Sequence, residues 1–302
     1  MTVKSSPSSA AAEAGINPAI VDRYAWSSDS VRLHYRDYAG DASNPAILCL
    51  PGLTRNARDF EALATSLAPR FRVVTPSFRG RGESGYAKDP LTYVPLVYLR
   101  DLGLVIEEAG LKRFIIVGTS LGGLMGLLLD MTHRDSIVGL VLNDLGPTME
   151  ESGLQRVRSQ VGRGGNWPTW LHAARDIARR QAFIYPGWSL EKWLSYSKRL
   201  CRVSREGRIA WDYDPEIAAP FDLPHNDSSL DLWLALDGFR GRPVLSLRGE
   251  RSDILTAQTQ ARMQERIPGL EAVTVPKVGH APTLEEPDAV KAINSFLARF
   301  AP

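Results

Sequence analysis

Ser120 stands in a short turn, bounded by glycines, between two strongly apolar segments. Residues 114–119 form an apolar run rich in β-branched side chains, the turn is Gly118-Thr119-Ser120-Leu121-Gly122, and the residues that follow suit a buried helix. A Gly-x-Ser-x-Gly turn between a strand and a helix projects its serine hydroxyl into a cleft. Its glycines predict close backbone packing without room for a Cβ. We therefore expect Ser120 to be a nucleophile suited to attack on an acyl carbonyl.

A serine nucleophile needs a general base, and His280 is the best placed of the five histidines in the chain. It follows a predicted strand, in the sequence Val278-Gly279-His280-Ala281-Pro282. Loops at the carboxyl ends of parallel strands collect ligands and catalytic groups in such sheets. A base downstream of the serine also fits the chain order serine, acid, histidine.

Two carboxylates compete to orient His280. Asp253 lies just beyond the predicted strand 244–247 and is the preferred acid, because a carboxylate beside the imidazole fixes its tautomer and stabilises the imidazolium. Asp144 ends the predicted strand 137–142 and is the alternative acid. Its other interpretation is a turn cap ahead of Gly146-Pro147, since aspartate side chains bond local backbone N–H groups.

Two backbone amides are expected to form an oxyanion hole. Leu121 supplies one amide at the start of the helix after Ser120. Leu53 supplies the other, from the loop 51–56 that follows the apolar run 46–50. Preorganised N–H donors of this kind stabilise the charge that develops on a carbonyl oxygen. The alternative interpretation of Pro51-Gly52 is a tight turn without a catalytic role.

The remaining periodicity predicts a mostly parallel sheet. Residues 23–26 and 31–38 alternate as in an antiparallel hairpin, and helical stripes separate the runs that follow. Strands that alternate with helices indicate a sheet covered on both faces. The predicted core strands are 46–50, 72–75, 114–119, 137–142, 244–247 and 270–275, and the predicted helices include segments near 60–67, 99–109, 256–267 and 288–300.

Residues 147–226 interrupt this alternation. Tryptophans crowd there without a clear buried strand, and residues 151–212 contain twelve Arg or Lys against five Asp or Glu. We expect a mainly helical cap inserted into a core formed by residues 23–146 and 227–302, after a flexible tail at residues 1–22. Trp167 and Trp170 are candidate substrate-pocket residues. The excess of basic residues fits either a solvated helical surface or attraction of anionic substrates.

Composition excludes several other classes of protein. The 302 residues are 44% hydrophobic and 23% charged, as in a globular protein with a full core. A net charge of +2 gives no case for nucleic-acid or membrane binding, and two cysteines fit no metal or disulfide framework. No apolar run is long enough for a transmembrane helix. We expect no cofactor, no metal and a cytoplasmic location.

These motifs together resemble those of the α/β-hydrolase superfamily, in its branch of cap-bearing serine esterases, lactonases and carbon–carbon hydrolases. The likeness runs from about Tyr24 to Phe300 and includes Gly-Thr-Ser-Leu-Gly-Gly, Arg-Gly-Glu-Arg-Ser-Asp and Gly-His-Ala-Pro-Thr-Leu-Glu-Glu-Pro. The resemblance implies an eight-stranded α/β-hydrolase sheet with a helical lid. Pro51 stands where the family commonly has histidine, and Ser77 where relatives often have aspartate.

The resemblance implies a serine hydrolase that cleaves carboxylic esters or lactones through an acyl-enzyme. Its substrate would be a small-molecule ester or lactone. Two alternatives are hydrolysis of a carbon–carbon bond in a ring-cleavage product, which calls for an acidic substrate held by arginines, and a receptor that binds a ligand without turnover.

Overall fold

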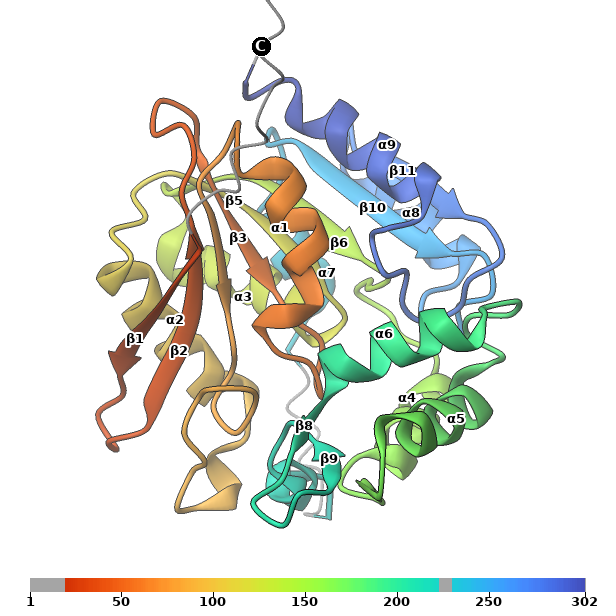
Figure 1. Ribbon diagram of the computed structural model, residues 1–302. Helices are drawn as coiled ribbons and strands as arrows, with labels where there is room; N and C mark the ends of the chain where they lie inside the picture. The colour runs from red at the N-terminus through yellow and green to blue at the C-terminus, as the bar shows by residue number, and fades with distance from the viewer. Residues whose placement is uncertain (1–19, 223–229, 302) are drawn as a thin grey trace, which may run out of the picture.

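A computed structural model of the chain describes residues 20–222 and 230–301, and its central element is an eight-stranded sheet (Figure 1). The strand order is β1-β2-β4-β3-β5-β6-β10-β11. β2 runs antiparallel to both of its neighbours, whereas the pairs from β4 to β11 are parallel. The strands are β1 (Ile20–Trp26), β2 (Arg32–Tyr38), β3 (Ala46–Leu50), β4 (Val73–Pro76), β5 (Phe114–Thr119), β6 (Ile137–Asn143), β10 (Val244–Gly249) and β11 (Glu271–Val275).

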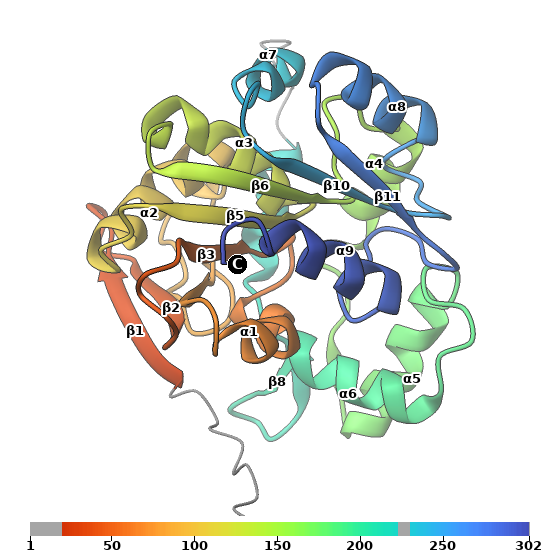
Figure 2. The same ribbon diagram turned by 90° about the horizontal axis from the view of Figure 1, so that it is seen from above.

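Helices cover both faces of this sheet, as the view from above shows (Figure 2). The buried hydrophobic residues form two cores, one on each face of the sheet, and the side chains of β3 point to them alternately. Leu48 and Leu50 face the first core, and Ile47 and Cys49 face the second. This alternation, together with complete burial of β3, is what a parallel strand in a three-layer fold requires. The first core includes α2 (Pro95–Glu108), α3 (Leu121–His133), α7 (Leu232–Asp237) and α8 (Ala257–Arg266), and the second includes α1 (Glu61–Leu67) and α9 (Pro287–Leu297).

The predicted fold class is confirmed, and most strand bounds agree within two residues. The predicted hairpin is β1 and β2, although β1 begins at Ile20, inside the predicted tail. The rest of that tail, residues 1–19, lies outside the described residues. α7 was not predicted from the sequence, because its six residues are too short to show a periodic stripe.

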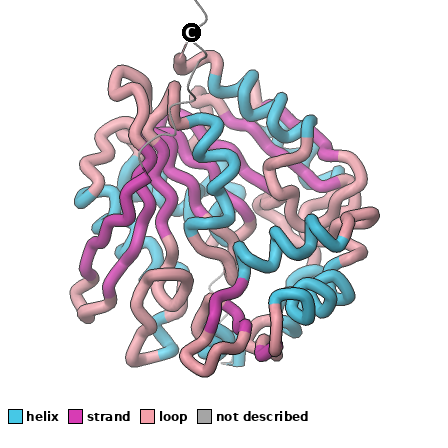
Figure 3. Tube along the Cα trace, viewed as in Figure 1, coloured by secondary structure: helices cyan, strands magenta, loops and turns pink. Residues whose placement is uncertain are grey.

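The segment after β6 departs from strand–helix alternation, and we refer to its described residues, 147–222, as the cap (Figure 3). It contains a small antiparallel sheet in the order β7-β9-β8, which the sequence did not predict. The predicted end of the cap at residue 226 lies outside the described residues. Its elements are α4 (Glu151–Gln160), β7 (Asn166–Trp167), α5 (Trp170–Gln181), α6 (Leu190–Leu200), β8 (Cys201–Val203), β9 (Ile209–Trp211) and the 3-10 helix η3 (Pro215–Asp222).

Ion pairs join the cap to the core near the carboxyl ends of the parallel strands. Arg156 of α4 contacts Asp253, which follows β10, and Arg199 of α6 contacts Glu285. On the other side, Arg58 of the 3-10 helix η1 (Ala57–Phe60) contacts Asp212 at 2.5 Å. The cap therefore packs over the edge of the sheet where Ser120 and His280 lie.

Candidate active site

Ser120 occupies a strained turn between β5 and α3. Its φ of 51° and ψ of −115° lie in a region that non-glycine residues rarely adopt. A Cβ added at Gly118 would approach Gly122 O to 2.4 Å, and one added at Gly122 would approach Leu50 O to 1.9 Å. Both glycines are therefore required by close backbone packing, as the sequence predicted.

His280 lies within hydrogen-bond distance of the candidate nucleophile. Its Nε2 is 2.9 Å from Ser120 Oγ. The loop that carries it is held from two sides, because Asn143 Nδ2 donates to Pro282 O at 2.9 Å and Tyr185 Oη donates to Ala281 O at 2.8 Å. Asn143 belongs to the core and Tyr185 to the cap, so both parts of the molecule position the imidazole.

Asp144 contacts the other nitrogen of His280. Its Oδ2 lies 2.8 Å from His280 Nδ1, and its side chain is completely buried. Two donors from the loop after β10 hold the same carboxylate: Gly249 N donates to Oδ1 at 2.8 Å and Ser252 Oγ donates to Oδ2 at 2.6 Å. The arrangement Ser120–His280–Asp144 can orient the imidazole and stabilise its protonated form.

Asp253 does not contact His280, so the preferred assignment of the acid is corrected in favour of its alternative, Asp144. Arg156 binds the Asp253 carboxylate with Nε at 2.5 Å and Nη2 at 2.7 Å. α4 also packs against the backbone of Asp253, since a Cβ added at Gly153 would lie only 2.0 Å from Asp253 O. Partial burial works to raise the pKa of Asp253, but the hydrogen bond and charge of Arg156 outweigh it, so the pKa lies below its ordinary value.

The two residues expected to form the oxyanion hole lie on either side of Ser120. Leu121 is the first residue of α3, and Leu53 belongs to the loop after β3. That loop approaches the nucleophile closely: a Cβ added at Gly52 would lie 3.9 Å from Ser120 Cβ. Their catalytic role stays a prediction, and of the two residues Leu53 lines the cavity that contains Ser120.

A cavity of about 130 Å³ opens on Ser120 and His280 between core and cap. Neither Trp167 nor Trp170 lines it, so the prediction that they form the pocket wall is not supported; Trp211 lines it instead. Trp167 packs edge-on against Trp211, with ring centroids 4.9 Å apart, and Trp170 is partly buried against the second hydrophobic core. The other lining residues are Gly52, Leu53, Thr54, Arg55, Asp59, Thr119, Arg156, Val157, Gln160, Val161, Gln181, Ile184, Tyr185, Tyr196, Leu200, Tyr213, Ala281, Pro282 and Thr283.

Sequence comparison agrees with this geometry. The sequence profile of the family described as "Alpha/beta hydrolase family" matches residues 47–293. The chain belongs to the α/β-hydrolase family. It is 32% identical over 273 residues to a 3-hydroxybutyrate-oligomer hydrolase from Cupriavidus necator, a match that covers 88% of this chain and 92% of the relative. It is 26% identical to a 2-(acetamidomethylene)succinate hydrolase from Mesorhizobium japonicum, over 84% of this chain and 88% of that one.

A solved structure of an α/β hydrolase from Novosphingobium aromaticivorans is also similar to this chain. It shares 52% sequence identity and superposes with a TM-score of 0.89, covering 93% of this chain and 98% of the other. This α/β hydrolase thus has relatives named as hydrolases across nearly its whole length, and the chain is a hydrolase by family.

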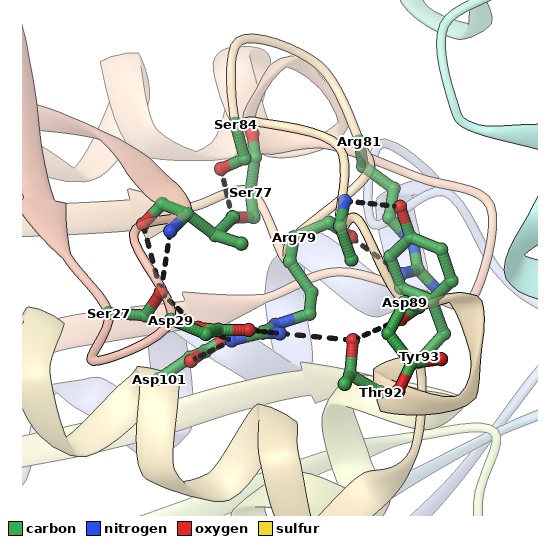
Figure 4. A network of polar contacts seen from close by, with 12 residues as sticks. Ser27, Asp29, Ser77, Arg79, Arg81, Ser84, Asp89, Thr92, Tyr93 and Asp101 are labelled. Atoms are coloured by element: carbon green, nitrogen blue, oxygen red, sulfur yellow. Dashed lines mark hydrogen bonds and ion pairs between the residues drawn. The ribbon is translucent and has the colours of Figure 1, made fainter.

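A buried network of polar contacts around Arg79 and Arg81 (Figure 4) supports the Leu53 loop of this α/β hydrolase through Arg81. Arg81, which is completely buried, donates from Nε to Leu53 O at 2.9 Å and from Nη1 to Arg79 O at 2.7 Å. Arg79 is itself clamped by Asp101, at 2.6 and 2.8 Å, and by Asp29, at 2.7 Å (Figure 4). Burial raises the pKa of Asp101 against the opposing effect of Arg79. Through Arg81, the network fixes the carbonyl oxygen of Leu53 in the loop that is expected to contribute to the oxyanion hole.

Ser77, one of the two departures from the family pattern, joins the base of this network. Its Oγ accepts from Ala57 N at 3.1 Å, and its carbonyl accepts from Ser84 Oγ at 2.7 Å (Figure 4). These contacts hold the turn between residues 77 and 85. The serine therefore serves a structural turn, as the sequence suggested, and lies behind the loop rather than in the cavity.

Neither a metal cluster nor a membrane span is found among residues 20–222 and 230–301. No group of three or more His, Cys, Asp or Glu side chains there could hold a metal ion. In the same residues, no helix has the length and apolar character needed to cross a bilayer.

Proposed function

We propose that this hydrolase cleaves carboxylic esters or lactones by a serine mechanism with an acyl-enzyme intermediate. The observation that supports this most directly is the pair of contacts that link Ser120 Oγ, His280 and Asp144, at 2.9 and 2.8 Å. A nucleophile, a base and an orienting carboxylate in this order carry out acyl transfer on several unrelated folds.

In the proposed acylation step, Ser120 Oγ attacks the carbonyl carbon while His280 Nε2 takes the hydroxyl proton. The electron pair of the carbonyl moves to its oxygen, which the amides of Leu53 and Leu121 would stabilise. When the tetrahedral intermediate collapses, the bond to the alcohol oxygen breaks and His280 returns the proton to that oxygen. A lactone follows the same steps, except that its alcohol stays attached to the acyl group.

Deacylation uses the same groups in reverse. His280 Nε2 takes a proton from water, the hydroxide oxygen attacks the acyl carbon, and collapse expels Ser120 Oγ, which recovers the proton. Asp144 stays ionised and stabilises the imidazolium in both halves. The products are a carboxylic acid and an alcohol, and no other reactant is consumed.

The size of the cavity favours a small substrate. A cavity of about 150 Å³ holds a benzene molecule, and this one measures about 130 Å³. Short acyl groups fit such a space better than long fatty chains. Because a relative is named for 3-hydroxybutyrate oligomers, the linear dimer of 3-hydroxybutyrate is a suitable test substrate. We further propose a cytoplasmic location, in keeping with the buried, unpaired thiols of Cys49 and Cys201.

Labelling and turnover test this proposal together. A fluorophosphonate should modify Ser120, and Ser120→Ala should abolish labelling and reduce kcat on 4-nitrophenyl butyrate by roughly 10⁶-fold, as in other serine hydrolases. Ser43→Ala, at an exposed serine bonded only locally to Asp41, is the matched control and should behave as wild type. Labelling at another serine, or hydrolysis that persists in Ser120→Ala, would contradict the mechanism.

Carbon–carbon hydrolysis is the second candidate, because Arg55 lines the cavity and could hold an acidic substrate. It predicts turnover of a vinylogous 1,5-diketone acid with little activity on activated esters. A receptor without turnover predicts ligand binding that protects the protein against unfolding, and no burst of 4-nitrophenol. The 4-nitrophenyl butyrate assay therefore separates an ester hydrolase from the other two candidates, and turnover of the diketone acid separates those two from each other.

A further inference from the structure

Among the described residues that line the cavity, two have a buried polar side-chain atom without a hydrogen-bond partner. These atoms are Nη1 of Arg55 and Oε1 of Gln181. One is a charged donor and the other an acceptor. Buried polar groups in folded proteins are nearly always paired, so each exception calls for an explanation. At the wall of a reactive cleft, a substrate group is the natural partner.

Arg55 is held in place through its other nitrogen. Nη2 donates to Tyr196 Oη, and the guanidinium carbon lies 4.9 Å from the centre of the Tyr196 ring. Tyr196 Oη lies 3.2 Å from Tyr185 Oη, which donates to Ala281 O. This chain of hydroxyl groups connects Arg55 to the residue after His280. The position of the guanidinium is thus tied to the catalytic loop.

The charge of Arg55 is only partly balanced. Asp59 Oδ1 is 4.0 Å from Nη1, which is too long for a hydrogen bond. Burial works to lower the pKa of Arg55, but the neighbouring Tyr196 and Asp59 raise it above its ordinary value, so the group stays a cation. By contrast, Arg156 in the same cavity is already occupied by both oxygens of Asp253. Arg55 is therefore the cation available to a ligand.

Arg55 also lies close to the nucleophile. The position that a Gly52 Cβ would occupy is 3.4 Å from Arg55 Cγ and 3.9 Å from Ser120 Cβ. The Arg55 side chain therefore starts beside the nucleophile, and both residues line the same cavity. Gln181, the last residue of α5, faces the same space from the cap. Its free acceptor suits the O–H of a substrate.

We propose that the cleft binds esters of short hydroxy acids, with the substrate's free carboxylate on Arg55 Nη1 and its hydroxyl on Gln181 Oε1. This assignment rests on the proposed function, since it names the substrate class of the same site. A linear 3-hydroxybutyrate dimer carries both groups, one at each end, with the ester between them.

Three probes separate the two contacts. They are the 3-hydroxybutyrate dimer, its methyl ester, which lacks the carboxylate, and 3-butyryloxybutyrate, which lacks the hydroxyl. Wild type should hydrolyse the dimer with a kcat/KM about ten- to a hundred-fold above that for the methyl ester, the range for hydrogen bonds to charged groups. Preference over the analogue without the hydroxyl should be smaller, about three- to tenfold.

Variants assign each preference to its residue. Arg55→Met should bring the ratio of dimer to methyl ester close to one, and Gln181→Leu should do the same for the ratio of dimer to 3-butyryloxybutyrate. Asp59→Asn removes the competing carboxylate and should raise the first ratio. Arg179→Gln, at a cap arginine whose side chain is 79% exposed, is the matched control, because it changes the net charge equally and should leave both ratios unchanged.

Binding to Ser120→Ala, measured by calorimetry, distinguishes failure of this inference from failure of the proposed function. If Ser120→Ala binds the dimer more tightly than the methyl ester but wild type hydrolyses no ester, the assigned contacts stand and the proposed reaction fails. If wild type hydrolyses 4-nitrophenyl butyrate but shows equal kcat/KM for dimer and methyl ester, the inference is overturned. Should Arg55→Met not fold, an unchanged ratio in both Arg55→Gln, which removes the charge but keeps a polar side chain, and Asp59→Asn would overturn it equally.

Discussion

The loops after β6 and β10 each place an aspartate at the carboxyl edge of the sheet, but they use it differently. Asp144 follows β6 directly, is fully buried, and accepts from Gly249, Ser252 and His280. Asp253 lies four residues beyond the end of β10, is about one-third exposed, and binds Arg156 of the cap. One carboxylate contacts the candidate base, and the other joins the cap to the core.

The difference shows that a strand-end position selects candidates without choosing between them. β6 and β10 are neighbours in the sheet, so both aspartates reach the same edge. Their environments decide the outcome. Ser252 turns toward Asp144, whereas Asp253, the next residue, lies against the backbone of α4 at Gly153. The loop after β10 therefore supports the acid of the site instead of supplying it.

The largest expected effect in this comparison comes from removing the charge of each aspartate. Asp144→Asn should reduce kcat by roughly 10⁴-fold, because an amide leaves the imidazole in the wrong tautomer. Asp253→Asn should keep kcat within a fewfold of wild type, since its carboxylate does not touch His280. Steady-state kinetics on 4-nitrophenyl butyrate measure both.

A reversed result would show that Asp253 takes over the imidazole during turnover. The double variant Asp144→Asn/Asp253→Asn tests whether Asp253 partly replaces Asp144 as the carboxylate beside His280. Equal kcat in the double variant and in Asp144→Asn means that Asp253 gives no residual support, and a further large loss means that it does.

A smaller effect should come from Ser252, which links the two loops. Ser252→Ala removes the hydroxyl that donates to Asp144 Oδ2 at 2.6 Å and accepts from Leu255 N at 3.0 Å. Loss of a hydrogen bond to a charged group costs about 1.5–3 kcal/mol, so kcat should fall about ten- to a hundred-fold. Ser252→Thr should recover much of it. A normal kcat in Ser252→Ala would mean that Gly249 N and His280 position Asp144 by themselves.

Much of this site could be predicted from the sequence because its constraints are local. The glycines around Ser120 are fixed by contacts of the turn with α3 and β3, and His280 follows the last strand in the expected chain order. The choice between Asp144 and Asp253 depends instead on contacts between residues more than 90 positions apart, such as Arg156 with Asp253. No spacing along the chain reveals which of two adjacent strand ends faces an imidazole.

The cavity wall was the least predictable part for a similar reason. Trp167 and Trp170 were chosen for their size, but Trp167 is covered by Trp211 and bonds Asp176 at 3.2 Å. The short strands of the cap set which aromatic side chains face the cleft, and two or three residues show too little periodicity to predict a strand. The role of Arg55 in the cavity wall could have been predicted from the sequence, because the loop 51–56 that contains it was already expected to contribute to the oxyanion hole.

A still smaller effect is expected from the ion pair between cap and core. Arg156→Ala should raise KM by about two- to fivefold and leave kcat nearly unchanged, because contacts that hold the cap act on ground state and transition state alike. Arg158→Ala, two residues further along α4 and in an ion pair with the exposed Glu151 at 3.7 Å, is the matched control. A loss of kcat without a change in KM would instead place Arg156 at the reacting atoms.

The smallest expected effect concerns stability and its dependence on pH. The pKa of Asp253 is lowered in the folded protein, so its ionised form favours folding at pH values above about 3.8, and this contribution is lost as the pH falls through the lowered value. At pH 7, Asp253→Asn should decrease the free energy of unfolding by about 0.5–1 kcal/mol, since the pair is partly exposed and screened by solvent. Urea unfolding should show the full difference between wild type and variant at pH 7 and pH 5 and a smaller difference at pH 3, and 1 M salt should reduce it at pH 7. A difference as large at pH 3 as at pH 7 would come from the packing of the loop, not from the charge, and Asp253 would then hold the cap by shape rather than by its pair with Arg156.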